Sequence, residues 1–336
     1  MDIGIAGAGL LGRLLAWRLA RARHRVTVFD PAAGPERGLQ PAAGFSAAGM
    51  LSPTAELDGA SPLIGTLGWQ SLQLWPRWLA ELQRPVHYAQ RGSLVLAHAG
   101  DRPSAMRWLA RVQAQSPREA PRPLQASELL ALEPAVASGL LGWHLAGEAA
   151  IHPVQAMDAL ASAGDEAGVR WQCQHTVQQV TPGQLDGQRF DHVFDVRGVG
   201  ARPALPVRGV RGEIFWLHAP GVALVHPLRL LHPRHRVYLV PRPRDIVVVG
   251  ASEIESEDRS PVSLRSTLEL LSAAHSVLPA LAEARIVHSE TNLRPALPDH
   301  LPRVHKEPGL TRINGLYRHG WLLAPALVQQ AIGEMT

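Results

Sequence analysis

The hydrophobic positions near the N-terminus change period twice. Residues 2–9 (DIGIAGAG) form a short apolar run that ends in glycines, and residues 25–30 (RVTVFD) form another. Between them, over residues 10–22, leucines recur at helical spacing. The pattern therefore predicts a strand, a helix and a second strand.

Both periods return later in the chain. Helical spacing predicts helices over residues 61–83, 102–115, 126–134 and 263–279, the last two with Ser127 and Ser263 as N-caps. Alternation predicts strands over residues 91–100, 175–180, 190–201, 210–220, 236–243 and 245–255, the last three as an antiparallel series. Residues 149–172 predict a strand end, a helix and a strand. A last helix is expected to begin near Leu323, with Pro325 in its first turn. This order predicts a β-rich module inserted into an α/β unit.

Composition narrows the class of protein. The chain has 336 residues, 46% hydrophobic and 18% charged, which predicts a globular protein of two domains or one large α/β unit. The net charge of +4 is spread without a basic block, which argues against a nucleic-acid partner and favours the binding of small anions.

No apolar run approaches the roughly 18 residues that a membrane span needs. Cys173 is the only cysteine, so a disulfide within the chain is excluded. Because the first strand begins at about Asp2, no signal peptide is expected, and we expect a cytoplasmic protein.

The glycines after the first strand fit the pattern G-x-G-x-x-G. Gly7 permits the tight turn, Gly9 lets the backbone approach a pyrophosphate at the helix N-terminus, and Gly12 lets helix and strand pack closely. Asp30 ends the second strand, where a carboxylate can accept the hydroxyls of a ribose. Strand, glycines, helix and acid together predict a dinucleotide site.

The spacing alone leaves NAD and FAD open as the dinucleotide. The small, glycine-rich segment 44–53 (GFSAAGMLSP) suits a backbone that passes close to a bulky cofactor, although a surface loop is the plain alternative. Gly198 and Gly200 end another predicted strand and form a second turn of close approach.

Other chemistry finds little support in the sequence. His226, His232 and His235 lie close together, but their spacing matches no standard zinc pattern, so we expect no metal. A G-x-S-x-G motif does not occur, and Cys173 has no activating neighbour in sequence.

Several motifs together resemble one enzyme family. They include GAGLLGRLLAWRLA, FSAAGMLSP, VRGEI, YLVPR, GASEIESED, LRPALPD and INGLYRHGWLLAPA, and they run in order from Ile5 to Ala326. In these motifs the chain resembles the FAD-dependent D-amino acid oxidase superfamily and, within it, the glycine oxidases of thiamine biosynthesis.

The resemblance implies a fold, a division of the chain and a reaction. The fold is α/β (α+β overall), a Rossmann-like FAD-binding domain with an inserted, mostly antiparallel substrate-domain sheet. We expect the FAD-binding domain over residues 1–80, 146–207 and 288–336, and the substrate domain over residues 81–145 and 208–287. The implied reaction oxidises an amine of a small amino acid to an imine, and dioxygen then yields hydrogen peroxide. FAD would be bound non-covalently, because Cys173 lies on the wrong segment for attachment. The family also implies a homo-oligomer, often a tetramer.

Three residues are implied at the substrate. Arg294 and Tyr238 would hold the carboxylate, and Arg318 would lie beside it. An arginine meets a carboxylate in a bidentate manner, and a phenol can add a hydrogen bond. Hydride transfer from a carbon beside a neutral amine needs no strong protein base. The plain alternatives are a structural ion pair for Arg294, a core position for Tyr238 and an interface position for Arg318.

The motif and the resemblance together predict a set of cofactor contacts. Met50 would border the flavin, and the N-terminus of the last helix, near Gly320, would stabilise the negative charge of the reduced flavin. The predicted contacts are Gly7, Ala8, Gly9, Leu10, Leu11, Gly12, Asp30, Ser46, Ala47, Ala48, Gly49, Met50, Val177, Gly198, Gly200, Arg294, His319, Gly320, Trp321, Leu322 and Leu323.

Four functions stay open at this point. They are an oxidase of glycine or a small amine, an oxidase of D-amino acids or N-methyl amino acids, a nicotinamide-dependent dehydrogenase, and a flavin-binding protein without turnover. Which amine is preferred depends on the size of the pocket, which the sequence does not define.

Overall fold

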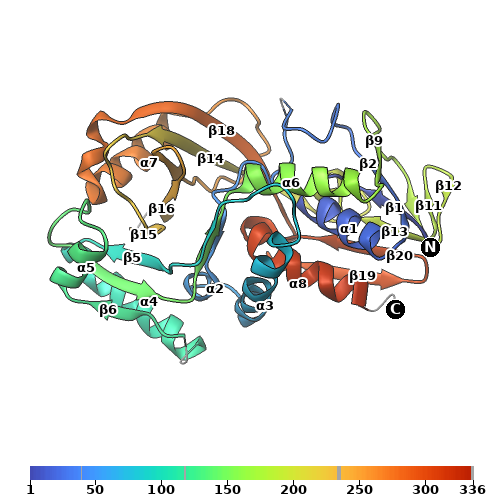
Figure 1. Cartoon of the computed structure of the whole chain (residues 1–336). Helices are drawn as coiled ribbons and strands as arrows, with labels where there is room; N and C mark the ends of the chain where they lie inside the picture. The colour runs from blue at the N-terminus through green and yellow to red at the C-terminus, as the bar shows by residue number, and fades with distance from the viewer. Residues whose placement is uncertain (39, 117–118, 233–235, 334–336) are drawn as a thin grey trace.

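The computed structural model describes residues 1–38, 40–116, 119–232 and 236–333, and two large sheets organise it (Figure 1). The first has six strands in the order β19-β20-β13-β1-β2-β9, parallel except at β19. Its strands are β1 (Asp2–Ala6), β2 (Arg25–Phe29), β9 (Arg170–Gln172), β13 (His192–Asp195), β19 (Arg303–Glu307) and β20 (Leu310–Asn314). The predicted strand–helix–strand unit is β1, α1 (Leu10–Arg21) and β2, which confirms that prediction.

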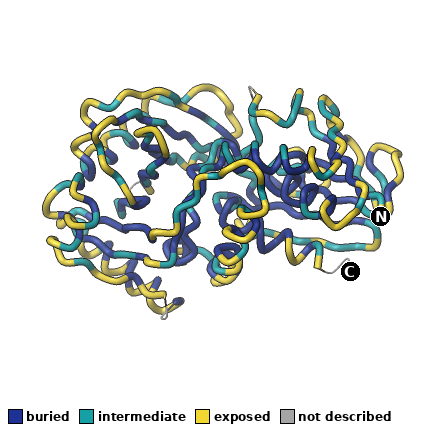
Figure 2. The backbone as a smooth tube through the Cα atoms, viewed as in Figure 1, coloured by how far each residue is buried: buried dark blue, intermediate teal, exposed yellow. Residues whose placement is uncertain are grey.

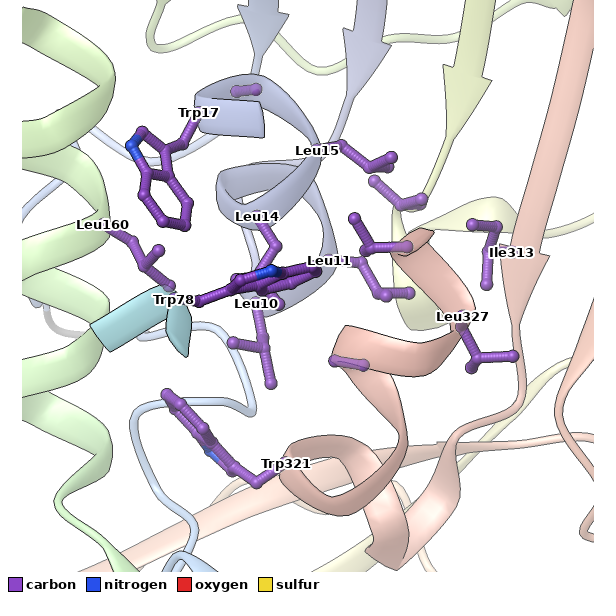
Figure 3. Close-up of a cluster of buried hydrophobic side chains, with 14 of the residues drawn as sticks. Leu10, Leu11, Leu14, Leu15, Trp17, Trp78, Leu160, Ile313, Trp321 and Leu327 are labelled. Carbon is purple, nitrogen blue, oxygen red and sulfur yellow. The ribbon is translucent and has the colours of Figure 1, made fainter. Parts of the chain in front are cut away.

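Helices from distant parts of the chain pack around this sheet. They are α1, α3 (Pro62–Leu79), α6 (Pro153–Glu166) and α8 (Gly320–Gly333). Figure 3 shows the apolar cluster that they share, in which Leu14 of α1, Trp78 of α3, Leu160 of α6 and Leu327 of α8 are all buried. The C-terminal helix is therefore part of the core beside the first strand.

The second sheet has eight strands in the order β18-β14-β17-β16-β15-β5-β7-β6. Every pairing is antiparallel except β15 with β5, as expected for a mostly antiparallel module. Its strands are β5 (Ser93–Ala97), β6 (Arg122–Leu124), β7 (Leu141–Leu145), β14 (Arg208–His218), β15 (Leu228–Leu231), β16 (Arg236–Arg242), β17 (Ile246–Gly250) and β18 (Arg285–Ala296). Helices α4 (Arg102–Gln115), α5 (Ala126–Leu132) and α7 (Leu264–Val277) accompany this sheet (Figure 1).

Short elements lie between and beside the two sheets. One three-stranded sheet consists of β3 (Met50–Leu51), β8 (Ala149–Ile151) and β4 (Tyr88–Ala89). The short helix α2 (Pro53–Glu56) follows β3 in the chain. Another consists of β10 (Val180–Thr181), β11 (Gln184–Leu185) and β12 (Gln188–Arg189). Figure 2 shows that buried stretches lie mainly in the interior of the molecule and that exposed stretches lie mostly in the outer loops.

The predicted division into domains stays a prediction. The strand order agrees with an inserted module, because β14 to β17 and β5 to β7 join one sheet while β1, β2 and β20 join the other. The predicted boundary between residues 287 and 288 falls inside β18, a continuous strand of the second sheet.

Two of the local predictions need correction, and one is confirmed. Helix α5 begins at Ala126, so Ser127 lies inside its first turn, and the Glu128 carboxylate instead accepts from the Gln125 N–H at 2.8 Å. Residues 175–179 are not a strand, and pairing begins only at β10, because the Asp186 carboxylate accepts the N–H groups of Gln178 and Gln179. The N-cap predicted at Ser263 is confirmed.

The last helix begins earlier than predicted. It starts at Gly320 rather than near Leu323, which places Pro325 in the helix interior. Proline has no N–H, so the carbonyl of Trp321 loses its helical partner. That carbonyl instead accepts from Trp75 Nε1 of α3 at 3.0 Å, and the Ala326 N–H donates to Ser71 Oγ at 3.1 Å. Helix α3 therefore offsets the cost of the proline.

Candidate active site

A cavity of about 520 Å³ lies where the two large sheets meet. One end is lined by the turn between β1 and α1, and the other by Gly212 of β14, Tyr238 of β16 and Arg294 of β18. Of the residues predicted for the site, the cavity is lined by Gly7, Ala8, Gly9, Leu10, Leu11, Asp30, Ser46, Ala47, Ala48, Gly49, Met50, Val177, Gly198, Gly200, Tyr238, Arg294, Arg318, Gly320 and Trp321. The structure thus brings together residues from the whole length of the chain.

Four predicted cofactor residues do not line this cavity. Leu322 and Leu323 are buried in the apolar core of the first sheet. His319 is buried and its Nδ1 lies 3.5 Å from the Glu56 carboxylate. A Cβ on Gly12 would lie 1.8 Å from the Gly7 carbonyl oxygen, so Gly12 serves the close packing of the turn against the helix.

The turn after β1 is built for close approach of a ligand. Gly7 has φ of +107°, which favours glycine, and Gly9 precedes the first residue of α1. A Cβ on Gly9 would meet only Ala42, at 3.8 Å, so this side of the turn is open. The free N–H groups of the first helical turn lie here, as a phosphate requires.

The Asp30 carboxylate closes the end of this turn. It accepts the Ala8 N–H at 2.6 Å and the Ala32 N–H at 2.9 Å. These bonds hold the end of β2 against the glycine turn, and the same carboxylate lines the cavity. Its position therefore suits the ribose role that the sequence predicted.

Arg13 was missed by sequence reasoning, although it follows the third motif glycine. Its side chain is buried and donates to the carbonyls of Ala8 (2.8 Å), Met157 (2.9 Å) and Pro35. No carboxylate pairs with it within the described ranges, and burial lowers the pKa of Arg13 to about 10. It remains a cation at neutral pH beside the dinucleotide end. A charged residue inside an apolar helical stripe was the available signal.

Arg294 lies at the opposite end of the cavity. Its Nη1 donates to the carbonyl of Ser252 at 3.0 Å, and its guanidinium lies across Gly212, where a Cβ would come within 2.5 Å of Cζ. The part of the chain that the structure describes gives Arg294 no carboxylate partner. The structural ion pair considered for Arg294 is therefore absent from the described residues.

Tyr238 belongs to the same end of the cavity. Burial raises the pKa of Tyr238, although the charges of Arg294 and Arg229 oppose the shift. The phenol is therefore protonated at neutral pH and can donate a hydrogen bond.

Arg318 reaches the cavity but is already paired. Its Nη2 lies 3.0 Å from Oε2 of Glu56, and Arg229 Nη2 donates to Oε1 of the same carboxylate at 2.7 Å. Burial would raise the pKa of Glu56, but the charges of Arg229, Arg318 and His319 hold it well below its usual range. Glu56 is thus a buried anion shared by two arginines. Sequence reasoning missed Glu56 and Arg229 because they lie far apart in sequence.

The described residues contain no cluster of three His, Cys, Asp or Glu side chains that could hold a metal. His226 instead bonds Glu133 through Nδ1 at 2.7 Å, and His235 lies outside the described residues. Across the same ranges, none of the helices has both the length and the apolarity to cross a bilayer.

One end of the cavity thus has bare backbone against which a dinucleotide can bind, and the other end has an arginine without a carboxylate partner among the described residues. This arrangement is typical of a dinucleotide-dependent oxidoreductase built from two sheets. The chain belongs to the DAO family of FAD dependent oxidoreductases, whose family profile matches residues 2–331. FAD, rather than a nicotinamide nucleotide, is therefore the cofactor.

Individual relatives agree with the family. A Rhizobium etli protein named as the thiamine biosynthesis oxidoreductase ThiO is 39% identical over 97% of this chain and 94% of its own length. The crystal structure of glycine oxidase from Geobacillus kaustophilus, 27% identical, superposes with a TM-score of 0.86 over 100% of this chain and 95% of that chain. An FAD-bound L-alpha-glycerophosphate oxidase from Mycoplasma pneumoniae, 19% identical, shares the fold with a TM-score of 0.79 over 98% of this chain and 93% of that chain.

The cavity fits FAD by an observation independent of the family. A Cβ on Gly320 would meet nothing within 4 Å, and one on Gly9 would meet only a distant methyl group. Both glycines line the cavity, so side chains there would occupy the space that a ligand needs.

Proposed function

We propose that the protein is an FAD-dependent oxidase of glycine or a similar small amino acid. The observation that carries this proposal is Arg294, a cation at the end of the cavity with no carboxylate partner among the described residues and with Tyr238 beside it. An amino acid supplies the missing anion. The similarity to the glycine oxidase and to ThiO supports the same substrate class.

The chain's own residues divide the work of holding cofactor and substrate. The turn at Gly7 and Gly9 and the Asp30 carboxylate would hold the adenosine diphosphate part of FAD, and the segment at Gly49 and Met50 would border the flavin. Bound FAD would supply the acceptor for a hydride equivalent from the substrate carbon, with dioxygen as the final oxidant. Arg294 would bind and orient the substrate carboxylate, and the protonated Tyr238 phenol would donate to it. No protein base is assigned, because the amine reacts in its neutral form.

Arg318 takes a second role in this proposal. Because Glu56 already neutralises much of its charge, we propose that Arg318 shapes the wall of the substrate pocket rather than serving as the main carboxylate ligand. The remaining predicted cofactor contacts belong to the same proposal. His319, Leu322 and Leu323 would act through packing and Gly12 through the turn.

The wider biological setting is also part of the proposal. The imine product would supply thiazole synthesis in thiamine biosynthesis, as the name of the Rhizobium etli relative suggests. An oxidase of D-amino acids or of sarcosine is the alternative from the same family. Hydrogen peroxide as product, a cytoplasmic location and a homo-oligomer, including a tetramer, remain predictions.

The test is a substrate panel on the purified yellow protein. Peroxide release is measured with glycine, sarcosine and D-alanine, and flavin bleaching is followed without oxygen. We expect bleaching and peroxide with at least one of them. If none bleaches the flavin, the protein binds FAD without turnover of these amines, and the proposal fails.

A further inference from the structure

A second cavity, of about 230 Å³, adjoins the substrate end of the first. Arg229 and Arg236 line both cavities, so they form the wall between them. Three more charged residues, Asp58, Arg107 and Arg111, line only the second cavity. The two cavities are therefore neighbours, and arginines make up most of the charged lining of the second.

The strand register relates the second cavity to the carboxylate end. Arg229 of β15 lies directly opposite Tyr238 of β16. Arg236 precedes Tyr238 by two residues on β16, so both side chains are on one face of the sheet, roughly 6.6 Å apart along the strand. A ligand held near Tyr238 needs only a short arm to reach Arg236.

The arginines that line the second cavity are not all balanced by carboxylates among the described residues. Arg111 is paired with Asp58, and Arg229 with Glu56. Arg229 nevertheless has a buried Nε without a hydrogen-bond partner. Arg236 is exposed and makes no ion pair with any residue that the structure describes. Burial is the main cause of the low pKa of His319, and the charge of Arg236 adds to it after those of Arg318 and Arg229. A carboxylate bound at Arg294 neutralises Arg294 and leaves Arg236 uncompensated.

We propose that the second cavity is a subsite for a second anionic group on the substrate. The substrate class would be amino acids with a short arm that ends in a carboxylate, carried on the amine nitrogen or on the α-carbon. This inference rests on the proposed function for the first carboxylate. The distal anion binds beside Arg236 and Arg229 while the first is held at Arg294.

The first test measures binding without turnover. Succinate and butyrate, which have the same number of carbons, are titrated into the holoenzyme by calorimetry. We expect succinate to bind roughly 5- to 10-fold more tightly, which lies between the effect of an exposed ion pair and that of a charge-assisted hydrogen bond. In Arg236→Gln the ratio should fall toward one. In Arg285→Gln, an exposed arginine paired with Glu283 on the far end of β18, the ratio should be unchanged. Equal binding of succinate and butyrate to the unaltered protein would overturn the subsite.

The second test separates the two positions of the arm. N-carboxymethylglycine is compared with N-methylglycine, and D-aspartate with D-alanine, by kcat/KM. A higher value for the dianion in either pair, reduced by Arg236→Gln, supports the subsite and identifies where the arm is attached. If the monoanions are oxidised and neither dianion is favoured, the subsite is wrong and the proposed function stands. If no amine is oxidised but succinate binding still depends on Arg236, the proposed function is wrong and the anion subsite stands.

Discussion

Gly212→Ala should impair the proposed substrate clamp without unfolding the protein. The added Cβ would lie 2.5 Å from Cζ of Arg294, whereas ordinary contact begins at 3.4 Å. The guanidinium would therefore have to retreat by about 1 Å, a displacement that can reduce a rate by roughly 100-fold. We expect kcat/KM for the preferred amino acid to fall by roughly 10- to 100-fold.

The cost in stability should be small. The atoms that the new methyl group meets are the far end of a flexible arginine, not backbone, and Gly212 does not have a positive φ that would exclude alanine. The free energy of unfolding should therefore change by less than about 1 kcal/mol, as for most substitutions without a cavity or a lost partner.

The assay pairs this variant with two others. Arg294→Gln removes the charged group itself and should lower kcat/KM by roughly 10- to 150-fold, since a hydrogen bond to a charged group contributes about 1.5–3 kcal/mol. Gly100→Ala, at a position with open space around it, is the control and should have no effect. All three variants should retain FAD by absorbance. Full activity of Gly212→Ala, with its flavin intact, would refute the assignment of Arg294 to the substrate.

Three further predictions follow from the site. Glu56→Gln leaves two buried arginines without their carboxylate and should cost roughly 3–5 kcal/mol in urea denaturation of the holoenzyme, and an unchanged midpoint would contradict the shared ion pair. Burial lowers the pKa of His319 to about 4, so the unfolded chain takes up this proton first as pH falls. The neutral His319 side chain therefore contributes fully to the free energy of unfolding above about pH 6.5, and roughly 3 kcal/mol of that free energy should be lost as the pH falls to 4. His319→Asn should flatten this part of the plot of stability against pH, and an unchanged plot would contradict the assignment. Gly12→Ala would place a Cβ 1.8 Å from the backbone oxygen of Gly7, so the purified variant should lack flavin colour, and a full flavin-to-protein ratio would show that the turn can adjust.

The dinucleotide end of the site was readable from the sequence because its signals are local. Gly7, Gly9 and Asp30 lie within one strand–helix–strand unit, and each has a steric or polar reason that spacing alone conveys. The carboxylate end depended on the resemblance to a family, because Tyr238 and Arg294 come from different strands.

The rest of the site depends on contacts that no local pattern announces. Glu56 meets Arg229 and Arg318 only after α2, β15 and the turn that precedes α8 have come together. The pairing of Arg318 is the clearest case, since its neighbours in sequence do not indicate a buried carboxylate. Similarly, residues 175–179 alternate as a strand would, but the carboxylate of Asp186 accepts the N–H groups of Gln178 and Gln179.

The proline in α8 makes the last helix depend on a helix made much earlier. During synthesis α3 leaves the ribosome long before α8, and until then the indole N–H of Trp75 and the apolar face around it have no partner from the C-terminal segment. Helix α8 in turn has an unsatisfied carbonyl at Trp321 unless α3 is present. This half of the protein therefore completes its folding only after α8 itself has been synthesised, and the part of the flavin cavity lined by Gly320 and Trp321 forms at that late step.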